Sequence, residues 1–243
     1  MCQRRLDLFV TGTDTAVGKT VISAALLSLW HGRGLAAAPM KPIQTGCQRY
    51  GRDWVAPDLE VCLRLTGLQP SLAIKRDMAP YCLGPACAPH LAARLARRRI
   101  RIDRIERSFQ SLCLRYPALV VEGSGGVLVP INERQTILDM MRALALPVVL
   151  VARPGLGTLN HTLLTLNVLR QARLTIAGVI LNASARQRPG LVERDNRLFI
   201  ERMGQVPVWG CLPFIEDWSR QAFQDLCRRR LSGALSWQEH GRG

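Results

Sequence analysis

Short apolar runs alternate with segments of helical periodicity along almost the whole chain. The apolar runs have the length and the mostly unbroken apolar character typical of buried strands, although Asp7 interrupts the first of them. They cover residues 6–10, 35–40, 118–123, 147–152, 174–181 and 206–212. Between them, apolar residues recur at helical spacing over residues 21–27, 56–66, 91–99, 102–114, 136–145, 157–171, 191–203 and 220–229. Because strands alternate with helices, right-handed crossovers predict an α/β fold with a mostly parallel sheet and helices on both faces.

Three stretches lack such periodicity. Residues 43–53 are polar and glycine-rich and predict a loop, as do residues 123–130. Residues 69–89 contain four prolines and predict a long ordered connection over the ligand site. We therefore expect one domain over residues 1–231 and a flexible tail over residues 232–243.

Composition narrows the class of protein. A chain of 243 residues that is 48% hydrophobic suits a single domain with a sizeable core. Its apolar runs fall short of the ~20 residues that span a bilayer, which predicts no membrane segment. The N-terminus leads directly into the first strand and leaves no room for a signal peptide, which predicts a cytoplasmic location. In that compartment the eight scattered cysteines are expected to be reduced thiols.

The chain is strongly basic, with a formal net charge of +15. Such a charge raises nucleic acid as a possible partner. The arginine clusters at 97–101 and 228–230 lie on predicted helices and contain no interleaved aromatic residues. This pattern favours a solvated arginine surface over a nucleic-acid interface.

Lysine is rare in this basic chain. Of the 33 basic residues, 30 are arginine, and the three lysines are Lys19, Lys41 and Lys75. Lysine carries a compact ammonium on a flexible stem, whereas arginine carries a planar guanidinium. Lysine at positions 19 and 41 is therefore expected to be required by the chemistry.

Residues 11–20, Thr-Gly-Thr-Asp-Thr-Ala-Val-Gly-Lys-Thr, connect the first predicted strand to the first predicted helix. Five residues separate Gly12 from Gly18, one more than in the usual phosphate-loop pattern. Backbone N–H groups of such a loop and the helix N-terminus bind phosphate. Lys19 is expected to reach the terminal phosphates, and the Thr20 hydroxyl to ligate Mg²⁺. The fold expected is therefore that of a P-loop NTPase.

Other polar residues stand where predicted strands end, the edge at which parallel sheets bind ligands. Mg²⁺ prefers oxygen ligands, and Glu122, with Asp58 or Asp53, could join Thr20 as ligands. Glu122 could instead cap a helix, and Asp58 lies near a helix start where aspartate is commonly a cap. Asn182 suits adenine recognition or the opening of a turn.

Several motifs in order resemble the dethiobiotin synthetase family. They are Gly-Thr-Asp-Thr-x-Val-Gly-Lys-Thr, then Lys-Pro-Ile-Gln-Thr-Gly from Lys41, then Glu-Gly-Ser-Gly-Gly-Val-Leu-Val-Pro from Glu122, and Gly-Thr-Leu-Asn-His before Asn182. The 17-residue step from Lys41 to Asp58 is also similar. Ala16 departs from the polar or acidic residue often present in the family, and Leu59 follows Asp58 where a small residue is usual.

The resemblance implies a site and its ligands. Nucleotide contacts are expected at Ala16, Val17, Gly18, Lys19, Thr20, Val21, Asp58, Glu122, Gly123, Ser124, Gly125, Asn182, Pro213, Phe214 and Ile215. Mg²⁺ ligands are expected at Thr20, Asp58 and Glu122, catalytic roles at Lys19 and Lys41, and substrate contacts at Thr45, Thr158, Leu159 and Asn160. The expected substrates are 7,8-diaminopelargonic acid, CO₂ or bicarbonate, and ATP. The expected assembly is a homodimer, in which the helix beginning near Thr158, as a possible cap, receives the substrate carboxylate across the interface.

Two other classes remain open at this point. A partition-type or septum-site ATPase shares the loop and fold, but its signature lysine would stand where this chain has Thr13 and Asp14. A basic nucleic-acid-binding module would require the arginines between residues 97 and 107 to face a groove or a strand.

Overall fold

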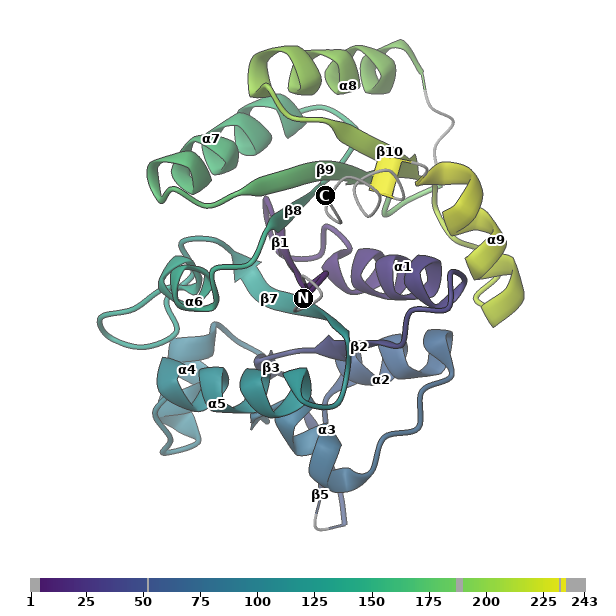
Figure 1. The fold of residues 1–243 in the computed structure, drawn as a ribbon. Helices are drawn as coiled ribbons and strands as arrows, with labels where there is room; N and C mark the ends of the chain where they lie inside the picture. The colour runs from purple at the N-terminus through teal and green to yellow at the C-terminus, as the bar shows by residue number, and fades with distance from the viewer. Residues whose placement is uncertain (1–4, 52, 187–189, 232, 235–243) are drawn as a thin grey trace.

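The central element is a parallel sheet. The computed structural model describes residues 5–51, 53–186, 190–231 and 233–234. Within those residues six strands pair in the order β10-β9-β8-β1-β7-β2, every pair parallel (Figure 1). The strands are β1 (Leu8–Gly12), β2 (Ala37–Met40), β7 (Ala118–Gly126), β8 (Val148–Ala152), β9 (Ile176–Asn182) and β10 (Val208–Leu212).

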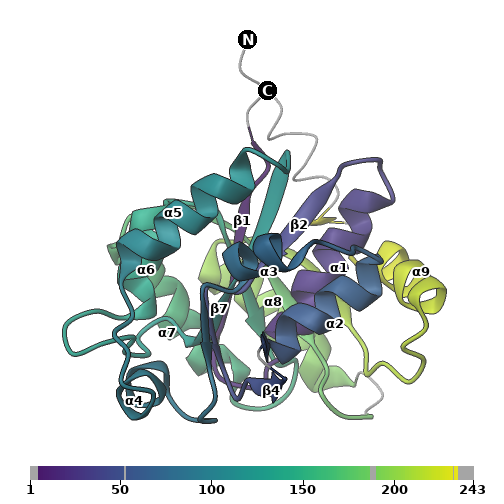
Figure 2. The same cartoon turned by 90° about the horizontal axis from the view of Figure 1, so that it is seen from below.

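Helices cover both faces of this sheet. Figure 2 shows α1 (Lys19–His31), α2 (Pro57–Thr66) and α9 (Arg220–Arg230) on one side. It shows α5 (Ile102–Cys113), α6 (Ile137–Leu144) and α7 (Thr158–Gln171) on the other. Helix α8 (Leu191–Gly204) packs beside α7, the short helix α3 (Leu72–Met78) packs against α5, and the short helix α4 (Pro89–Leu95) contacts the strand of residues 43–45. The predicted α/β fold is confirmed.

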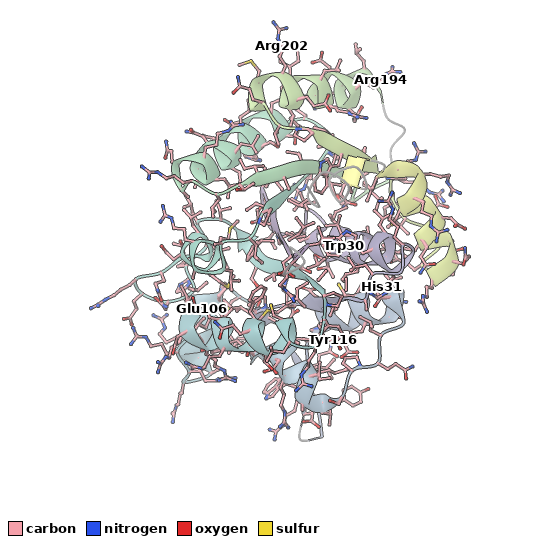
Figure 3. The ribbon with its side chains drawn as sticks, viewed as in Figure 1. Trp30, His31, Glu106, Tyr116, Arg194 and Arg202 are labelled. Carbon is pink, nitrogen blue, oxygen red and sulfur yellow. The ribbon has the colours of Figure 1, made fainter. Side chains whose placement is uncertain are left out.

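Side chains of β1 alternate between the two faces of the sheet, and helices cover both faces. Phe9 belongs to a core cluster with residues of α5 and α6, whereas Leu8 and Val10 pack in a second cluster with α1 and α9. Successive side chains of a strand point to opposite faces, so a strand covered twice must be apolar throughout. Trp30 of α1, labelled in Figure 3, is 2% exposed and fills the second cluster.

Two predicted loops contain regular structure. The stretch 43–53 includes β3 (Ile43–Thr45) and β4 (Gln48–Tyr50) and reaches the first residue of β5 (Asp53–Val55). The stretch 69–89 includes α3 and β6 (Tyr81–Leu83), and β6 pairs in parallel with β3. These elements are too short to show periodicity, and the strands exist because each finds a partner strand.

The glycine-rich stretch after Glu122 is also partly strand. β7 continues to Gly126, which pairs with Gly12 across the sheet, so the predicted loop begins later than its composition indicated. Glycine is usually depleted in strands. Here Gly126 is held in the strand by its parallel pairing with Gly12 of β1.

The predicted flexible tail, residues 232–243, can be compared with the structure only in part. Most of residues 232–243 lie outside the described residues; of those that are described, Ala234 is buried in the second core cluster. Among the described residues, no helix is both long enough and apolar enough to cross a bilayer.

The basic clusters lie on the surface. Arg97, Arg98 and Arg99 are exposed, as are the arginines of 228–230. Arg194 and Arg202 of α8 project away from the body of the protein in Figure 3. The expectation that this charge is solvated and recruits no nucleic acid stays a prediction.

Candidate functional site

The loop between β1 and α1 is built around one glycine. Gly18, the residue before α1, has φ +94°, and a Cβ there would lie 2.1 Å from the Asn182 side-chain nitrogen. That nitrogen donates to the Val17 carbonyl at 3.0 Å. The end of β9 therefore holds the loop in position, and only glycine satisfies both the left-handed backbone and the close approach.

Lys19, the first residue of α1, lies folded over the loop. Its ammonium donates to the Asp14 carbonyl at 2.8 Å, and the residue is 7% exposed. Burial, and then the neighbouring charge of Lys41, lowers the pKa of Lys19 to about 8. The helix N-terminus and this ammonium together make the loop attractive to an anion.

A second buried lysine is held between two carboxylates. The Lys41 ammonium lies 2.5 Å from Glu122 Oε1 and 2.7 Å from Asp58 Oδ2, and it also donates to the Gly123 carbonyl at 3.2 Å. We call Lys41, Asp58 and Glu122 the Lys41 cluster. Although burial alone lowers the pKa of Lys41, the charges of Glu122 and Asp58 raise it above the ordinary lysine value. Lys41 is therefore a fixed positive charge.

The Lys41 cluster adjoins the phosphate loop through Thr20. The Thr20 hydroxyl donates to Glu122 Oε1 at 2.9 Å. Burial raises the pKa of Asp58, but the charge of Lys41 and the hydrogen bonds from Lys41, Gln44 and Thr20 outweigh it and lower that pKa. One hydroxyl and two carboxylates thus converge on Lys41 and the start of α1.

The structure separates Asp58 from Asp53. Asp53 lies in β5 and pairs with Arg76 at 3.5 Å, away from Lys41. Asp58 is not the N-cap of α2, which is Ala56, and its side chain turns to Lys41. Glu122 lies inside β7 and caps no helix. The capping alternatives for both carboxylates are wrong.

These groups line one pocket of about 410 Å³ at the carboxyl ends of β1 and β7. Its lining residues are Thr15, Ala16, Gly18, Lys19, Thr20, Val21, Lys41, Gln44, Thr45, Asp58, Glu122, Ser124 and Gly125. Val17, Gly123 and Asn182 contact members of this set from behind. Sequence order had separated most of these residues by many positions, and the parallel sheet brings them to one edge.

The donor chemistry of this pocket fits Mg²⁺. Thr20, Asp58 and Glu122 offer hard oxygen donors, two of them anionic, and Mg²⁺ in nucleotide sites binds few protein groups besides the phosphates. No group of three or more His, Cys, Asp or Glu side chains gathers as a metal cage within the described residues. The arrangement therefore suits a cation that is shared with phosphate.

Some predicted site residues lie elsewhere. Thr158, Leu159 and Asn160 open α7 and do not line this pocket. Thr158 is not the cap of α7: Gly157 occupies that position, and Thr158 hydroxyl pairs with that of Thr162. Among the residues after β10, Pro213 lines a different pocket, Phe214 is 42% exposed, and Ile215 is buried in the core.

Two lining residues escaped sequence reasoning. The Gln44 side-chain oxygen accepts from the Asp58 N–H at 3.3 Å, which fixes the start of α2 beside Lys41. Thr15 lies in the loop next to Ala16, and its carbonyl accepts from Arg153 at 3.4 Å. Gln44 belongs to the motif that begins at Lys41, and Thr15 belongs to the phosphate-loop motif beside Ala16. Their membership of these motifs could have identified them as site residues.

The sheet and the site together define a class. A loop ending in Gly-Lys-Thr between a central parallel strand and a helix, with an acidic residue on the adjacent strand, is the arrangement of a P-loop nucleotide-binding protein. A family model described as an AAA domain matches residues 7–222.

Curated relatives narrow the class further. The chain is 34% identical over 216 residues to the ATP-dependent dethiobiotin synthetase of Thermodesulfovibrio yellowstonii, covering 86% of this chain and 89% of that protein. It is 40% identical over 215 residues to the enzyme of the same name from Anaeromyxobacter dehalogenans, covering 88% and 93%. The chain belongs to the dethiobiotin synthetase family.

Solved structures of low sequence identity share the fold. The MinD cell division protein of Aquifex aeolicus superposes with a TM-score of 0.55 at 16% identity, covering 92% of this chain and 95% of that chain. At this identity the likeness shows the P-loop fold alone.

Proposed function

We propose that the protein is an ATP-dependent cyclo-ligase that converts 7,8-diaminopelargonic acid and CO₂ into dethiobiotin, with ATP giving ADP and phosphate. Membership of the dethiobiotin synthetase family supports this activity. The observation that carries it to this chain is the placement of Lys19 and Lys41. Two of only three lysines are buried on one pocket beside a phosphate loop, where an anion in transfer would need compact positive charge.

The reaction needs an activated carboxyl group. One amine of the substrate captures CO₂ as a carbamate, whose oxygen attacks the γ-phosphorus of ATP and releases ADP. The product of that step is a carbamic–phosphoric anhydride. The second amine attacks its carbonyl carbon, closes the ring and expels phosphate. Phosphoryl transfer of this kind depends on positioning and on neutralising charge.

Each member of the pocket has a role in this scheme. Lys19 and the loop N–H groups hold the β- and γ-phosphates. Lys41 lies between the phosphate and the carbamate and stabilises the charge that develops between them. Thr20, Asp58 and Glu122 would hold Mg²⁺, which supplies positive charge to the phosphate oxygens. Gln44 keeps Asp58 beside Lys41 through the Asp58 N–H.

The outer parts of both substrates lie further along the sheet edge. Asn182 and the segment 213–215 would contact adenine, and Thr45 would contact the amine or carbamate end of the diamine. The substrate carboxylate would bind the N-terminus of α7, near Leu159 and Asn160, where Leu156 is fully exposed. That site would come from a second copy, which makes the protein a homodimer with the substrate across the interface. We place this enzyme in the cytoplasm.

An ATP-consumption assay tests the activity directly. Purified protein with Mg²⁺ and ATP should consume ATP only when both diaminopelargonate and bicarbonate are present, and dethiobiotin should accumulate one for one with phosphate. Omission of either substrate provides the control. ATP hydrolysis that is indifferent to both substrates would instead favour an ATPase switch and would overturn the proposal.

A further inference from the structure

Cys47 and Cys82 lie near each other, close to the pocket-lining residues Gln44 and Thr45. In the parallel pair of β3 and β6, Gln44 lies opposite Cys82, and the Cys47 N–H donates to the Leu83 carbonyl at 3.0 Å. This pairing carries Cys47 alongside the end of β6, and Cys82 packs against the core cluster that contains Cys47. Two cysteines far apart in the sequence are thus neighbours across the β3–β6 pair.

The two thiols differ in access. Cys47 is 6% exposed, whereas Cys82 is half-buried and lines a second pocket of about 280 Å³, whose lining does not include Lys41, Asp58 or Glu122. A small oxidant can therefore reach Cys82 and cannot reach Cys47 directly. This is the arrangement of an attacking thiol with a resolving thiol behind it.

The second pocket is rich in unneutralised positive charge. Arg98 and Arg104 both lie over the ring of Tyr81, and Arg98 also donates to the Cys82 carbonyl. Within the described part of the chain, no carboxylate forms an ion pair with either arginine. The pocket's own acids, Asp53 and Glu60, pair with Arg76 and Lys75. Arg98 and Arg104 therefore give the pocket beside Cys82 a positive charge.

This environment distinguishes Cys82 from other cysteines. Interaction with the neighbouring Cys47 thiol, together with the charge of Arg98, lowers the pKa of the Cys82 thiol despite its partial burial. Burial raises the pKa of Cys62, Cys113, Cys211 and Cys227. Thiolate is the reactive form of cysteine, so oxidants should select Cys82 among these thiols.

We propose that Cys82 and Cys47 form a reversible, peroxide-sensitive disulfide in this protein. The Cys82 thiolate attacks one oxygen of hydrogen peroxide, the O–O bond breaks, and hydroxide leaves, which converts Cys82 to a sulfenic acid. The Cys47 sulfur then attacks that sulfur; an S–S bond forms, the S–O bond breaks, and water leaves with the Cys47 proton. Overall two thiols lose two electrons and peroxide becomes two molecules of water. An added dithiol reverses the change by thiol–disulfide exchange.

The disulfide would act on the neighbouring substrate pocket. The Cys47 thiol now donates to the Gln44 carbonyl, and Gln44 and Thr45 both line the pocket. Oxidation removes that thiol donor and ties the turn after β3 to β6. This consequence rests on the proposed function. The KM for the diamine should rise severalfold. The KM for ATP should change little, because the disulfide does not involve the phosphate loop.

The chemical test needs no activity. The full-length reduced protein is treated with increasing hydrogen peroxide, the remaining thiols are alkylated, and peptides are mapped without reduction. The expected first product is a peptide pair joined through Cys47 and Cys82, with a mass loss of two hydrogens that dithiothreitol reverses. Oxidation of other cysteines while Cys47 and Cys82 both remain alkylatable would overturn the proposal, as would a Cys82 cross-link to any other cysteine.

Variants make the test specific. Cys82→Ser should abolish the early cross-link, and Cys47→Ser should let Cys82 proceed to sulfinic acid, a gain of two oxygens, at the same peroxide concentration. Cys113→Ser is the matched control and should keep the cross-link. Equal cross-linking in Cys82→Ser would refute the pairing. If a variant does not fold, mapping of the unsubstituted protein decides, and a protein without synthetase activity would still report the disulfide.

Discussion

Lys19 and Lys41 lie on the same pocket, yet the two regions that hold them are built differently. In the phosphate loop, residues 12–20, the Lys19 ammonium meets a backbone carbonyl, and burial lowers its pKa to about 8. In the Lys41 cluster, two carboxylates surround the ammonium and raise its pKa. The charge of Lys19 therefore depends on pH near neutrality, whereas Lys41 is charged throughout the physiological pH range.

The difference follows from what each region must bind. The phosphate loop has only backbone N–H dipoles and a lysine whose pKa is lowered. A bound phosphate supplies the negative charge that stabilises the protonated form of this lysine. A buried ion cluster has already compensated its charges through close pairing, so it holds a fixed geometry. The first region suits capture of a nucleotide, and the second suits precise placement of charge during group transfer.

Replacing the Lys41 ammonium should cause the largest loss of activity, because it disrupts the Lys41 cluster. Lys41→Arg keeps the charge but puts a bulkier planar group between two carboxylates. We expect turnover to fall at least ~100-fold, about 2.7 kcal/mol of barrier, with a smaller change in ATP binding. Steady-state kinetics measures both. Lys75→Arg is the matched control, since Lys75 pairs with Glu60 outside the pocket and should keep near-normal turnover. Near-normal turnover in Lys41→Arg would remove Lys41 from the mechanism.

Removing one negative charge from the Lys41 cluster should have the next largest effect. Glu122→Gln is isosteric and leaves Asp58 beside Lys41, so the fold should persist. The amide lacks the charge that Mg²⁺ prefers. We expect turnover to fall roughly 30-fold, about 2 kcal/mol, and half-saturation to need more Mg²⁺. Glu60→Gln is the control for loss of a lysine partner. An unchanged Mg²⁺ titration would make Glu122 purely structural.

The pH dependence should sharpen the contrast between the two lysines. Lys19 is protonated below its pKa of about 8 and loses its charge as the pH rises through that value. ATP capture should therefore be favoured at lower pH: kcat/KM for ATP should fall about tenfold between about pH 7 and about pH 9, where the phosphates are already ionised. Lys41 keeps its charge across this range because its pKa is raised. A flat profile would mean that Lys19 stays charged.

A smaller effect is expected from the proposed carboxylate site, which lies outside both lysine regions. Asn160→Asp puts an anion at the start of α7, so the KM for diaminopelargonate should rise about fivefold, roughly 1 kcal/mol, with ATP unaffected. Asn160 is exposed, so the change should not disturb folding.

Mixing subunits then asks whether one active site spans two chains. Asn160→Asp and Lys41→Arg proteins, each impaired alone, should regain activity together, because one interface would carry both intact halves. Failure to regain activity, with subunit exchange demonstrated by native mass spectrometry, would place each site within one chain.

Long, periodic features were predictable because they are local. The strand–helix alternation and the loop ending at Thr20 were visible as spacing and order, and the structure confirms them. The short strands β3 and β6 were missed, since three residues carry no period and pairing alone makes them strands. Thr158 was taken as a possible cap, yet Gly157 holds that position with φ +85°.

Other decisions belonged to the tertiary structure. The sequence by itself determined the class of fold and the family, and it singled out two scarce lysines as candidates, because motifs and composition are properties of a chain. It favoured Asp58 with Asp53 as an open alternative, and it placed Cys47 and Cys82 35 residues apart without linking them. Only the folded chain puts Asp58 against Lys41 and the two thiols together, because those contacts depend on which strands pair and on where each helix begins.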